Sequence, residues 1–547
     1  MTVWAQNYNP TGSAALSTAL AASPLVVLLG SIVFLRMPIH RAALIALALT
    51  GVIAMAIFGM PADLAAASVV YGGAFGLFPI GWIILNVIFL YQLTVQRGHF
   101  DALRESLAAI APDSRIQLIL IAFAFGAFLE GVAGFGAPVA ITAAILVQLR
   151  FKPLQACALA LIANTAPVAF GAIGTPIITL EQVTGLNSHL VSMMVGRQLP
   201  FFSIMIPFWI VVIFAGWRGM LAIWPAALTA GIAFAVPQFL VSNFHGPWLV
   251  DVVSGGSSIV ATVVLLRFWR PKALWRMEGS ESAAPAGAPA RNRGELWQAW
   301  LPWMILTALI FVWGIPAVGN ALDRICAPQF AVPHLHHLVQ RMPPVVPAGA
   351  KPEAAVFKLN LLSATGTGIL LAALMAGFTM GVSPRQMLEC YGRNLWNIRL
   401  ALLTIAAMMA LGNLFKYCGT DATMGLALAH TGRLYPFFGT LLGWLGVALT
   451  GSDTSSNVLF GNLQAITAHQ AGVSPILMGA ANSSGGVMGK MLSAQSIVVA
   501  TTATNFYGEE GRIIRSVFVS SLVLVTLMGI LVTLQAYVAP FTGMVPK

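Results

Sequence analysis

Two acidic residues stand inside long apolar stretches of this 547-residue chain. Glu130 lies near the middle of residues 116–149, which contain no Lys or Arg, and Asp453 lies in the polar run Gly451–Asn457 between two apolar arms. Ionisable side chains are rare in such stretches and mark functional sites when they occur. Apolar surroundings favour a protonated carboxyl group, whereas a nearby cation favours the carboxylate. Each residue could therefore take up and release a proton, or could cap a helix.

Lys490 is a basic residue in a similar setting. It follows the polar run Asn482–Gly486 within an apolar segment. Its ammonium group could bind the carboxylate of a substrate, or it could neutralise Asp453 in a structural role. The sequence leaves both roles open.

The segment around Glu130 predicts a hairpin that enters and leaves a membrane on one side. Residues 116–149 are too long for one crossing of a hydrocarbon core about 30 Å thick and too short for two. The run Glu130–Pro138 at their middle is rich in residues that bend or break helices. We therefore expect a re-entrant hairpin whose tip lines a cavity, because irregular backbone is not tolerated against lipid. A helix broken near Asn164 is expected to follow over 153–180.

The same order of segments returns in the second half of the chain. Residues 434–470 predict a second hairpin with its tip at Gly451–Asn457, and residues 473–506 predict a second broken helix, interrupted at Asn482–Gly486. If successive spans cross the membrane in opposite directions, the second unit enters the membrane from the side opposite to the first. The two units are therefore expected to be inverted repeats. Such paired interruptions point to the binding site of a secondary transporter. Glycines that merely allow close helix packing are the alternative.

The composition fixes the class of protein that must hold these residues. Hydrophobic residues make up 58% of the chain and charged residues 8%, which excludes a water-soluble globule with a charged surface. Stretches of about 18 or more apolar residues recur, without the two-residue alternation of a membrane barrel. We expect an all-α polytopic membrane protein with about 12 spanning helices and the two hairpins.

The distribution of Lys and Arg gives the expected topology. The N-terminal stretch Met1–Gly12 has no basic residue, does not resemble a signal peptide and is placed outside. Threading from there puts Arg115, Arg218 and the loop Arg267–Arg293 in the cytoplasm and the loop Pro328–Lys351 outside. Asp421 and His430 are expected near the outer surface, in contact with water. The predicted divisions are a first half (1–267), a cytoplasmic linker (268–298) and a second half (299–547).

Four sequence motifs resemble the bacterial L-lactate permease family. They are FLEGVAGFGAPVAI (128–141), ANTAPVAFGAIGTP (163–176), GSDTSSNVLFGNLQ (451–464) and ANSSGGVMGKMLSAQSI (481–497). The resemblance extends over nearly the whole chain. It implies a multi-pass protein of the bacterial inner membrane that couples protons to the symport of L-lactate and related 2-hydroxy monocarboxylates such as D-lactate and glycolate. The two hairpins and broken helices are expected to move together, as in an elevator-type transporter.

A lactate anion requires hydrogen-bond donors for its carboxylate, which half-helix N-termini at the hairpin tips can offer. Glu130 and Asp453 are the predicted proton-coupling acids. Ser and Thr also cap helices or bond within them, which is the structural alternative. The predicted substrate-binding residues are Gly134, Gly136, Asn164 and Thr165 in the first unit and Ser452, Thr454, Ser455, Asn457, Asn482, Ser483 and Lys490 in the second.

Other classes of function are less well supported by the sequence. No GxxxxGK[ST] motif for ATP and no convincing nucleophile or metal constellation is present, so we expect neither an enzyme nor a cofactor, metal or nucleic-acid partner. A passive channel would need no coupling acid. Sodium is the alternative coupling ion, because oxygens at hairpin tips can also hold Na⁺. The sequence leaves the oligomeric state open.

Overall fold

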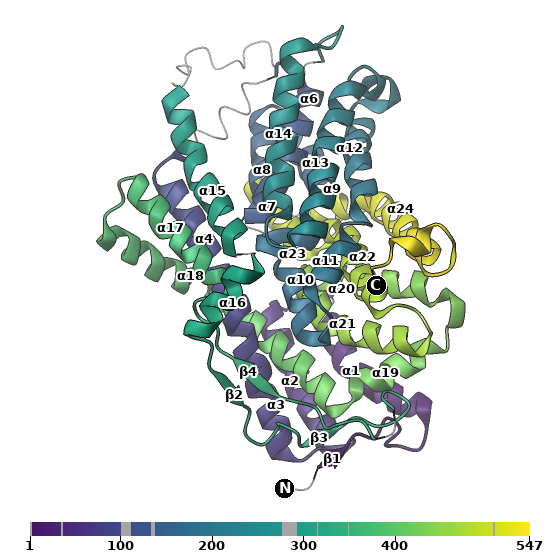
Figure 1. The fold of residues 1–547 in the computed structure, drawn as a ribbon. Helices are drawn as coiled ribbons and strands as arrows, with labels where there is room; N and C mark the ends of the chain where they lie inside the picture. The colour runs from purple at the N-terminus through teal and green to yellow at the C-terminus, as the bar shows by residue number, and fades with distance from the viewer. Residues whose placement is uncertain are drawn as a thin grey trace.

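The computed structural model describes residues 3–33, 35, 37–99, 111–132, 137–275, 293–313, 315–347, 349–506 and 509–546. These residues are helical almost throughout, which confirms the all-α class (Figure 1). Eight of the described helical segments are long and apolar enough to cross a membrane, or up to ten when each of two bent pairs counts as one span. A total of about 12 spans stays a prediction.

The described helices pack as two groups. The first group surrounds one long helix, α18, and consists of α1 (Ala14–Val33), α2 (Ile39–Ala56), α3 (Ala62–Phe75), η1 (Gly76–Gly81), α4 (Trp82–Gln96), α15 (Arg293–Trp313), α16 (Pro316–Ile325), α17 (Thr365–Thr379), α18 (Pro384–Cys418) and α19 (Thr420–Ala429). Helices α2, α3 and α4 pack on α18, α17 packs on α4 and α15, and α1 packs on α2 and α19.

The second group takes helices from both halves of the sequence. It consists of α6 (Ser114–Leu118), η2 (Ile119–Phe125), α7 (Gly126–Val132), α8 (Ala137–Gln148), α9 (Pro153–Ala163), η3 (Val168–Phe170), α10 (Gly171–Thr184), α11 (Ser188–Val195), α12 (Leu199–Leu221), α13 (Trp224–Phe244), α14 (Val250–Phe268), η5 (Gly432–Leu434), α20 (Tyr435–Thr450), α21 (Asp453–Gln470), α22 (Pro475–Gly489), η6 (Lys490–Leu492), α23 (Ala494–Ala503), α24 (Glu510–Tyr537) and η7 (Phe541–Met544). Helix α21 joins the two groups by packing on α18 and α19 as well as on α10 and α22.

All the segments predicted as hairpins and broken helices lie in the second group. Helix α7 packs against α8 and α20 against α21, with Gly451 in the left-handed conformation at the second turn. Helix α9 and the segment from η3 to α10 meet at a bend of 64°. Residues 133–136, between α7 and α8, lie outside the described residues. The re-entrant path of the hairpins, and their relation as inverted repeats, stay predictions.

The second broken span differs in detail from the expectation. Helix α22 continues through Asn482–Gly486, and the break falls later, at η6 and Ser493. A Cβ atom at Gly485 or Gly489 would collide with the backbone of α20. These glycines therefore serve close packing of two helices, which was the alternative reading of such residues.

The short strands and helix α6 lie at opposite ends of the molecule (Figure 1). At one end four strands form two short sheets: β1 (Trp4–Ala5) pairs with β3 (Val339–Gln340) in parallel, and β2 (Gln329–Ala331) pairs with β4 (Val356–Lys358) antiparallel. At the other end the Arg115 guanidinium donates hydrogen bonds to the carbonyl oxygens of Gly219 and Ala273, at 3.1 and 2.9 Å. The segments that contain Arg115, Gly219 and Ala273, all placed in the cytoplasm by the distribution of basic residues, thus meet at this end. Of the predicted linker, residues 276–292 lie outside the described part.

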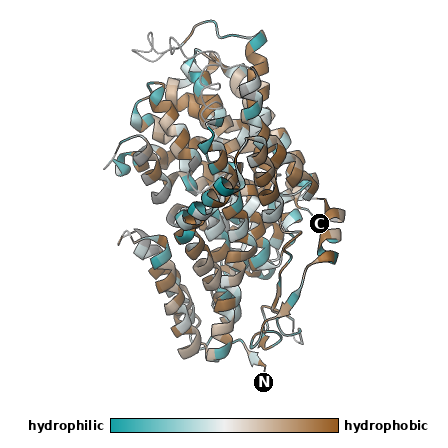
Figure 2. Ribbon diagram, turned by 90° about the vertical axis from the view of Figure 1, so that its left-hand side faces the viewer, coloured by the Kyte–Doolittle hydropathy of each residue, from teal (hydrophilic) through white to brown (hydrophobic). Residues whose placement is uncertain are grey.

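Large apolar side chains cover outward faces of the second group. Trp217 on α12, Phe239 on α13 and Val260 on α14 are exposed, and Figure 2 shows hydrophobic residues along most of the helical ribbon. In water such faces would be unfavourable. A lipid surrounding accounts for them.

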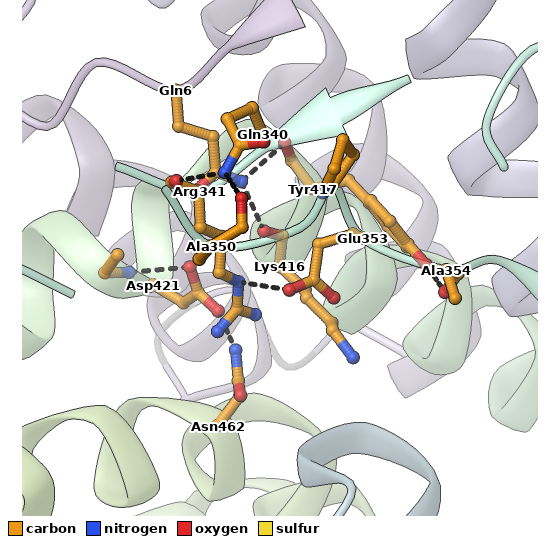
Figure 3. Close-up of polar contacts among 12 residues, drawn as sticks. Gln6, Gln340, Arg341, Ala350, Glu353, Ala354, Lys416, Tyr417, Asp421 and Asn462 are labelled. Carbon is orange, nitrogen blue, oxygen red and sulfur yellow. Dashed lines mark hydrogen bonds and ion pairs between the residues drawn. The ribbon is translucent and has the colours of Figure 1, made fainter. Parts of the chain in front are cut away.

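A cluster of two acids and two bases lies beside the strands (Figure 3). This outer cluster consists of Arg341, Glu353, Lys416 and Asp421. The Arg341 and Glu353 side chains form an ion pair at 3.2 Å, and Asp421 interacts electrostatically with Arg341 and Lys416. Asp421 also accepts hydrogen bonds from the Asn462 side chain on α21 and from the Ala422 backbone. The expectation that water surrounds Asp421 was wrong, since the residue is 3% exposed beneath the folded loop, whereas His430 is exposed.

Candidate functional site

Four ionisable side chains are buried where the two halves of the sequence meet in the second helix group. This central cluster consists of Glu130 on α7, Asp251 in the first turn of α14, Asp453 in the first turn of α21 and Lys490 directly after α22. Their exposed fractions are 3%, 1%, 3% and 5%. A buried charge is unfavourable unless an opposite charge and hydrogen bonds compensate it, so the partners of these four groups decide what the cluster can do.

Three members of the central cluster line one small cavity. Glu130 comes from the first predicted hairpin, Asp453 from the second, and Lys490 from the break after α22. The remaining wall comes from the broken helix and from the second turn, and is made of Val168, Gly171, Ala172, Thr175, Pro176, Gly451, Ser452 and Thr454. Polar groups on one side therefore face a wall that is largely apolar.

The broken helix is strained where it borders this cavity. Ala172 and Ile173 have φ angles of 45° and 56°, in the left-handed region that residues with a Cβ rarely adopt, and Gly174 follows with 72°. Strained backbone of this kind clusters at functional sites, where the surrounding packing must maintain it. The strain places Gly171 beside Glu130: a Cβ atom on Gly171 would lie 2.9 Å from Glu130 Oε1.

Lys490 lies between the two predicted coupling acids. Its Nζ donates a hydrogen bond of 2.7 Å to the carbonyl oxygen of Gly451, and the ammonium group interacts electrostatically with both Glu130 and Asp453. Among the described residues it forms no ion pair in direct contact with either carboxyl group. The two roles considered for Lys490 are therefore compatible, because one cation reaches both acids and the cavity.

Each of these two acids also has one neutral partner. The Asn164 side chain donates to Glu130 Oε2 at 2.9 Å, and the Ser483 hydroxyl donates to Asp453 Oδ2. Within the described part of the chain Asp453 Oδ1, Asn164 Oδ1 and Thr165 Oγ1 are buried without a hydrogen-bond partner. Such orphaned oxygens are uncommon in folded proteins and can be satisfied by a proton, a water molecule or a ligand.

The other predicted substrate-binding residues have different positions. Ser452 and Thr454 line the cavity, and the Ser452 hydroxyl caps α21 by accepting from the Ser455 backbone N–H at 3.2 Å. The Asn482 side chain donates to Asn457 Oδ1 at 2.9 Å, and Asn457 donates to the Pro176 carbonyl oxygen at 3.1 Å. These two asparagines thus tie α22, α21 and α10 together behind the cavity. Gly134 and Gly136 lie outside the described residues.

Sequence reasoning missed Asp251. It lies beside Gly131, whose added Cβ atom would be 2.8 Å from the Asp251 Cβ, and it interacts electrostatically with Glu130. Its signal in the sequence was a single acid at the start of an apolar helix, with Gly246 and Pro247 before it, but without the matching segment in the other half that drew attention to the hairpins. Within the described residues, no group of three or more His, Cys, Asp or Glu side chains could hold a metal ion.

The apolar spanning helices and the buried, charged cavity between them define a membrane transporter. The family described as L-lactate permease matches residues 17–539, so the chain belongs to the L-lactate permease family and is a multi-pass protein of the bacterial inner membrane.

Relatives with known names match the sequence of this chain over their full length. The chain is 45% identical to an L-lactate permease of Salmonella typhimurium over 100% of both chains, and 46% identical to glycolate permease GlcA of Escherichia coli, also over 100% of both. An L-lactate permease of Bacillus subtilis is 44% identical over 99% of this chain and 100% of the relative. The solved YdaH transporter of Alcanivorax borkumensis has a TM-score of 0.43 at 14% identity, covering 85% of this chain and 86% of that one, a likeness too distant to support an argument.

Proposed function

We propose that this protein is a secondary active transporter that couples protons to the symport of L-lactate, and of related 2-hydroxy monocarboxylates such as D-lactate and glycolate, across the cytoplasmic membrane. Relatives named L-lactate permease and glycolate permease over the full length support the substrate class. The observation that carries the proposal is the charge balance of the cavity, in which one buried lysine faces two buried acids.

Charge balance explains how one proton could accompany one lactate. Lys490 can neutralise one carboxylate in the empty cavity, either Glu130 or Asp453. A lactate anion that binds Lys490 displaces that carboxylate, which is then buried without a cation. Leaving it ionised would cost several kcal/mol, so it takes up a proton instead. The loaded cavity then contains lactate, Lys490 and protonated acids, and its net charge is unchanged.

The cavity also has groups suited to the carboxylate and to the methyl group of the substrate. The first turn of α21 presents the positive end of its helix dipole beside Ser452 and Thr454, which suits the carboxylate. Val168 and Ala172 offer an apolar wall for the methyl group. The remaining predicted residues, Asn164, Thr165, Ser455, Asn457, Asn482 and Ser483, would position this surface rather than contact lactate in the arrangement described.

The two helix groups suggest how the cavity could open alternately to each side. Both hairpin segments and both broken helices lie in the second group, which meets the first chiefly through α21 on α18 and α19. We propose that the second group moves as one body against the first, as in elevator-type transporters. Cysteine pairs that lock this interface in two incompatible positions would test the movement, and a single accessible position under all substrate conditions would contradict it.

Uptake of labelled L-lactate into sealed proteoliposomes tests the coupling. An inward proton gradient is imposed without sodium, and the parent is compared with Glu130→Gln, Asp453→Asn and the control Glu181→Gln on the same helix group. We expect uphill uptake by the parent and the control, and only lactate exchange by at least one of the two cavity variants. A parent that accumulates lactate only when sodium is added would instead support sodium coupling, with the carboxylates as cation ligands.

A further inference from the structure

Asp251 is the least compensated member of the central cluster. Its exposed fraction is 1%, and neither carboxyl oxygen has a hydrogen-bond partner among the described residues. The Ser254 hydroxyl, one turn further along α14, is also buried without a partner. A carboxylate in this position would lack both a cation and a hydrogen-bond donor, so the neutral, protonated acid is the favoured form.

No cation on the surrounding elements compensates Asp251 in the described part of the chain. Helix α14 packs against α7, η2, α10 and α13. Their acidic residues are Glu130 on α7 and Glu181 on α10, and the latter accepts a hydrogen bond from the Ser188 backbone. Before α14, the half-buried His245 stacks on Phe311 at 4.8 Å between ring centroids, and its Nε2 lies 3.1 Å from the Phe311 carbonyl oxygen. Among the described residues, Glu130 is the one charged group with which Asp251 interacts electrostatically.

Glu130 therefore stands between two different neighbours. It interacts electrostatically with both Lys490 and Asp251, and an opposite charge favours ionisation of an acid whereas a like charge opposes it. Two acids that interact in this way titrate as a pair, and ionisation of one opposes ionisation of the other. When Glu130 is ionised beside Lys490, the one proton of the pair is therefore on Asp251.

We propose that Asp251 is a second proton-carrying residue, which exchanges the coupled proton with Glu130 directly or through one water molecule. The inference rests on the proposed proton symport. When lactate displaces Glu130 from Lys490, the O–H bond of Asp251 breaks as an O–H bond forms on Glu130, and the negative charge passes only briefly to Asp251. Asp251 then recovers a proton from water, so the cycle consumes one proton for each lactate.

Asp251→Asn tests this role, because the amide has the same shape but carries no exchangeable acidic proton. Ser254→Ala is the matched control, since it alters a buried, unpartnered group on the same face of α14. Proton-driven uptake and lactate exchange are measured for each variant over a range of pH. We expect Asp251→Asn to exchange lactate like the parent but to take it up about tenfold more slowly or worse under a proton gradient, with a flattened pH profile. Ser254→Ala should keep the parent profile.

The outcomes separate this inference from the proposed function. If the parent fails to accumulate lactate with protons, the symport itself is wrong. If the parent accumulates lactate and Asp251→Asn does so equally well with the same pH profile, the symport stands and the role of Asp251 is overturned.

A spectroscopic measurement covers the case in which Asp251→Asn does not fold. Infrared spectra of the parent and of Glu130→Gln are compared for the C=O band of a buried protonated carboxyl group. We expect a remaining band in Glu130→Gln that titrates differently from any band of the parent, because the coupled neighbour is gone. Bands that titrate identically would contradict the pair.

Discussion

The central and outer clusters are both built from buried or half-buried charged side chains, yet they differ in the balance of acidic and basic groups. The outer cluster has two acids and two bases; Glu353 pairs with Arg341, and Asp421 accepts from Asn462 and Ala422. The central cluster has three acids and one base, and three of its carboxyl oxygens, those of Asp251 and one of Asp453, lack partners among the described residues. A balanced cluster needs nothing further and can hold segments together. An unbalanced one requires protons or a ligand.

Replacing the bases gives the largest expected contrast. Lys490→Gln removes the single cation of the central cluster and leaves a buried carboxylate without compensation, a change of about 3–5 kcal/mol. We expect both uptake and lactate exchange to fall about 100-fold or more. Lys416→Gln, the matched change in the outer cluster, should leave exchange within about threefold of the parent. Parent-like exchange by Lys490→Gln would refute its role at the site.

Replacing one acid in each cluster separates coupling from folding. Glu130→Gln should abolish accumulation against a gradient while lactate exchange continues, because the amide cannot carry the proton. Asp421→Asn should accumulate lactate like the parent. Both activities are measured in the same proteoliposome assay, and equal loss of accumulation in the two variants would mean that the contrast between the clusters has no functional meaning.

The same Asp421→Asn change should be visible as a loss of stability. Asp421 links α19 to α21 through Asn462 and lies beside Arg341 and Lys416. Losing the charge weakens these interactions by about 1–2 kcal/mol. The midpoint of thermal unfolding in detergent should fall relative to the parent. An unchanged or raised midpoint would show that the outer cluster does not stabilise the fold.

The smallest expected effect concerns the ion pair of the outer cluster. The Arg341 and Glu353 side chains are 14% and 25% exposed, so water screens part of their attraction. A double-mutant cycle with Arg341→Gln and Glu353→Gln should give a coupling energy of about 0.5–1 kcal/mol that weakens with added salt. A coupling energy above about 3 kcal/mol would contradict this expectation, because it would mean that the pair behaves as a fully buried ion pair.

The sequence predicted best where polar residues interrupt an apolar stretch. Glu130, Asp453 and Lys490 were found from that context alone, and the structure brings them to one cavity. Asp251 was missed because no matching segment in the other half of the chain marked it, and its importance comes from packing against Gly131, far away in the sequence.

Other differences have the same physical origin in long-range packing. Asn457 and Asn482 are polar at the expected positions, but their side chains bond to one another and to α10. Asp421 was placed in water because the sequence could not show that the loop carrying Arg341 and Glu353 folds over it. The glycines of α22 were read as a break, whereas their small size lets α20 approach. Residue type predicted where polar groups lie, and tertiary contacts decided what they bind.

The most direct test of the account is the number and charge of the ions that move with lactate. In proteoliposomes of the parent protein, lactate uptake and the change of internal pH are recorded together, with the membrane potential clamped at different values. If lactate replaces one carboxylate at Lys490, one proton should move with each lactate. The rate of lactate uptake should then follow the pH gradient but not the membrane potential. Uptake driven by the potential alone, or without proton movement, would contradict the proposed mechanism.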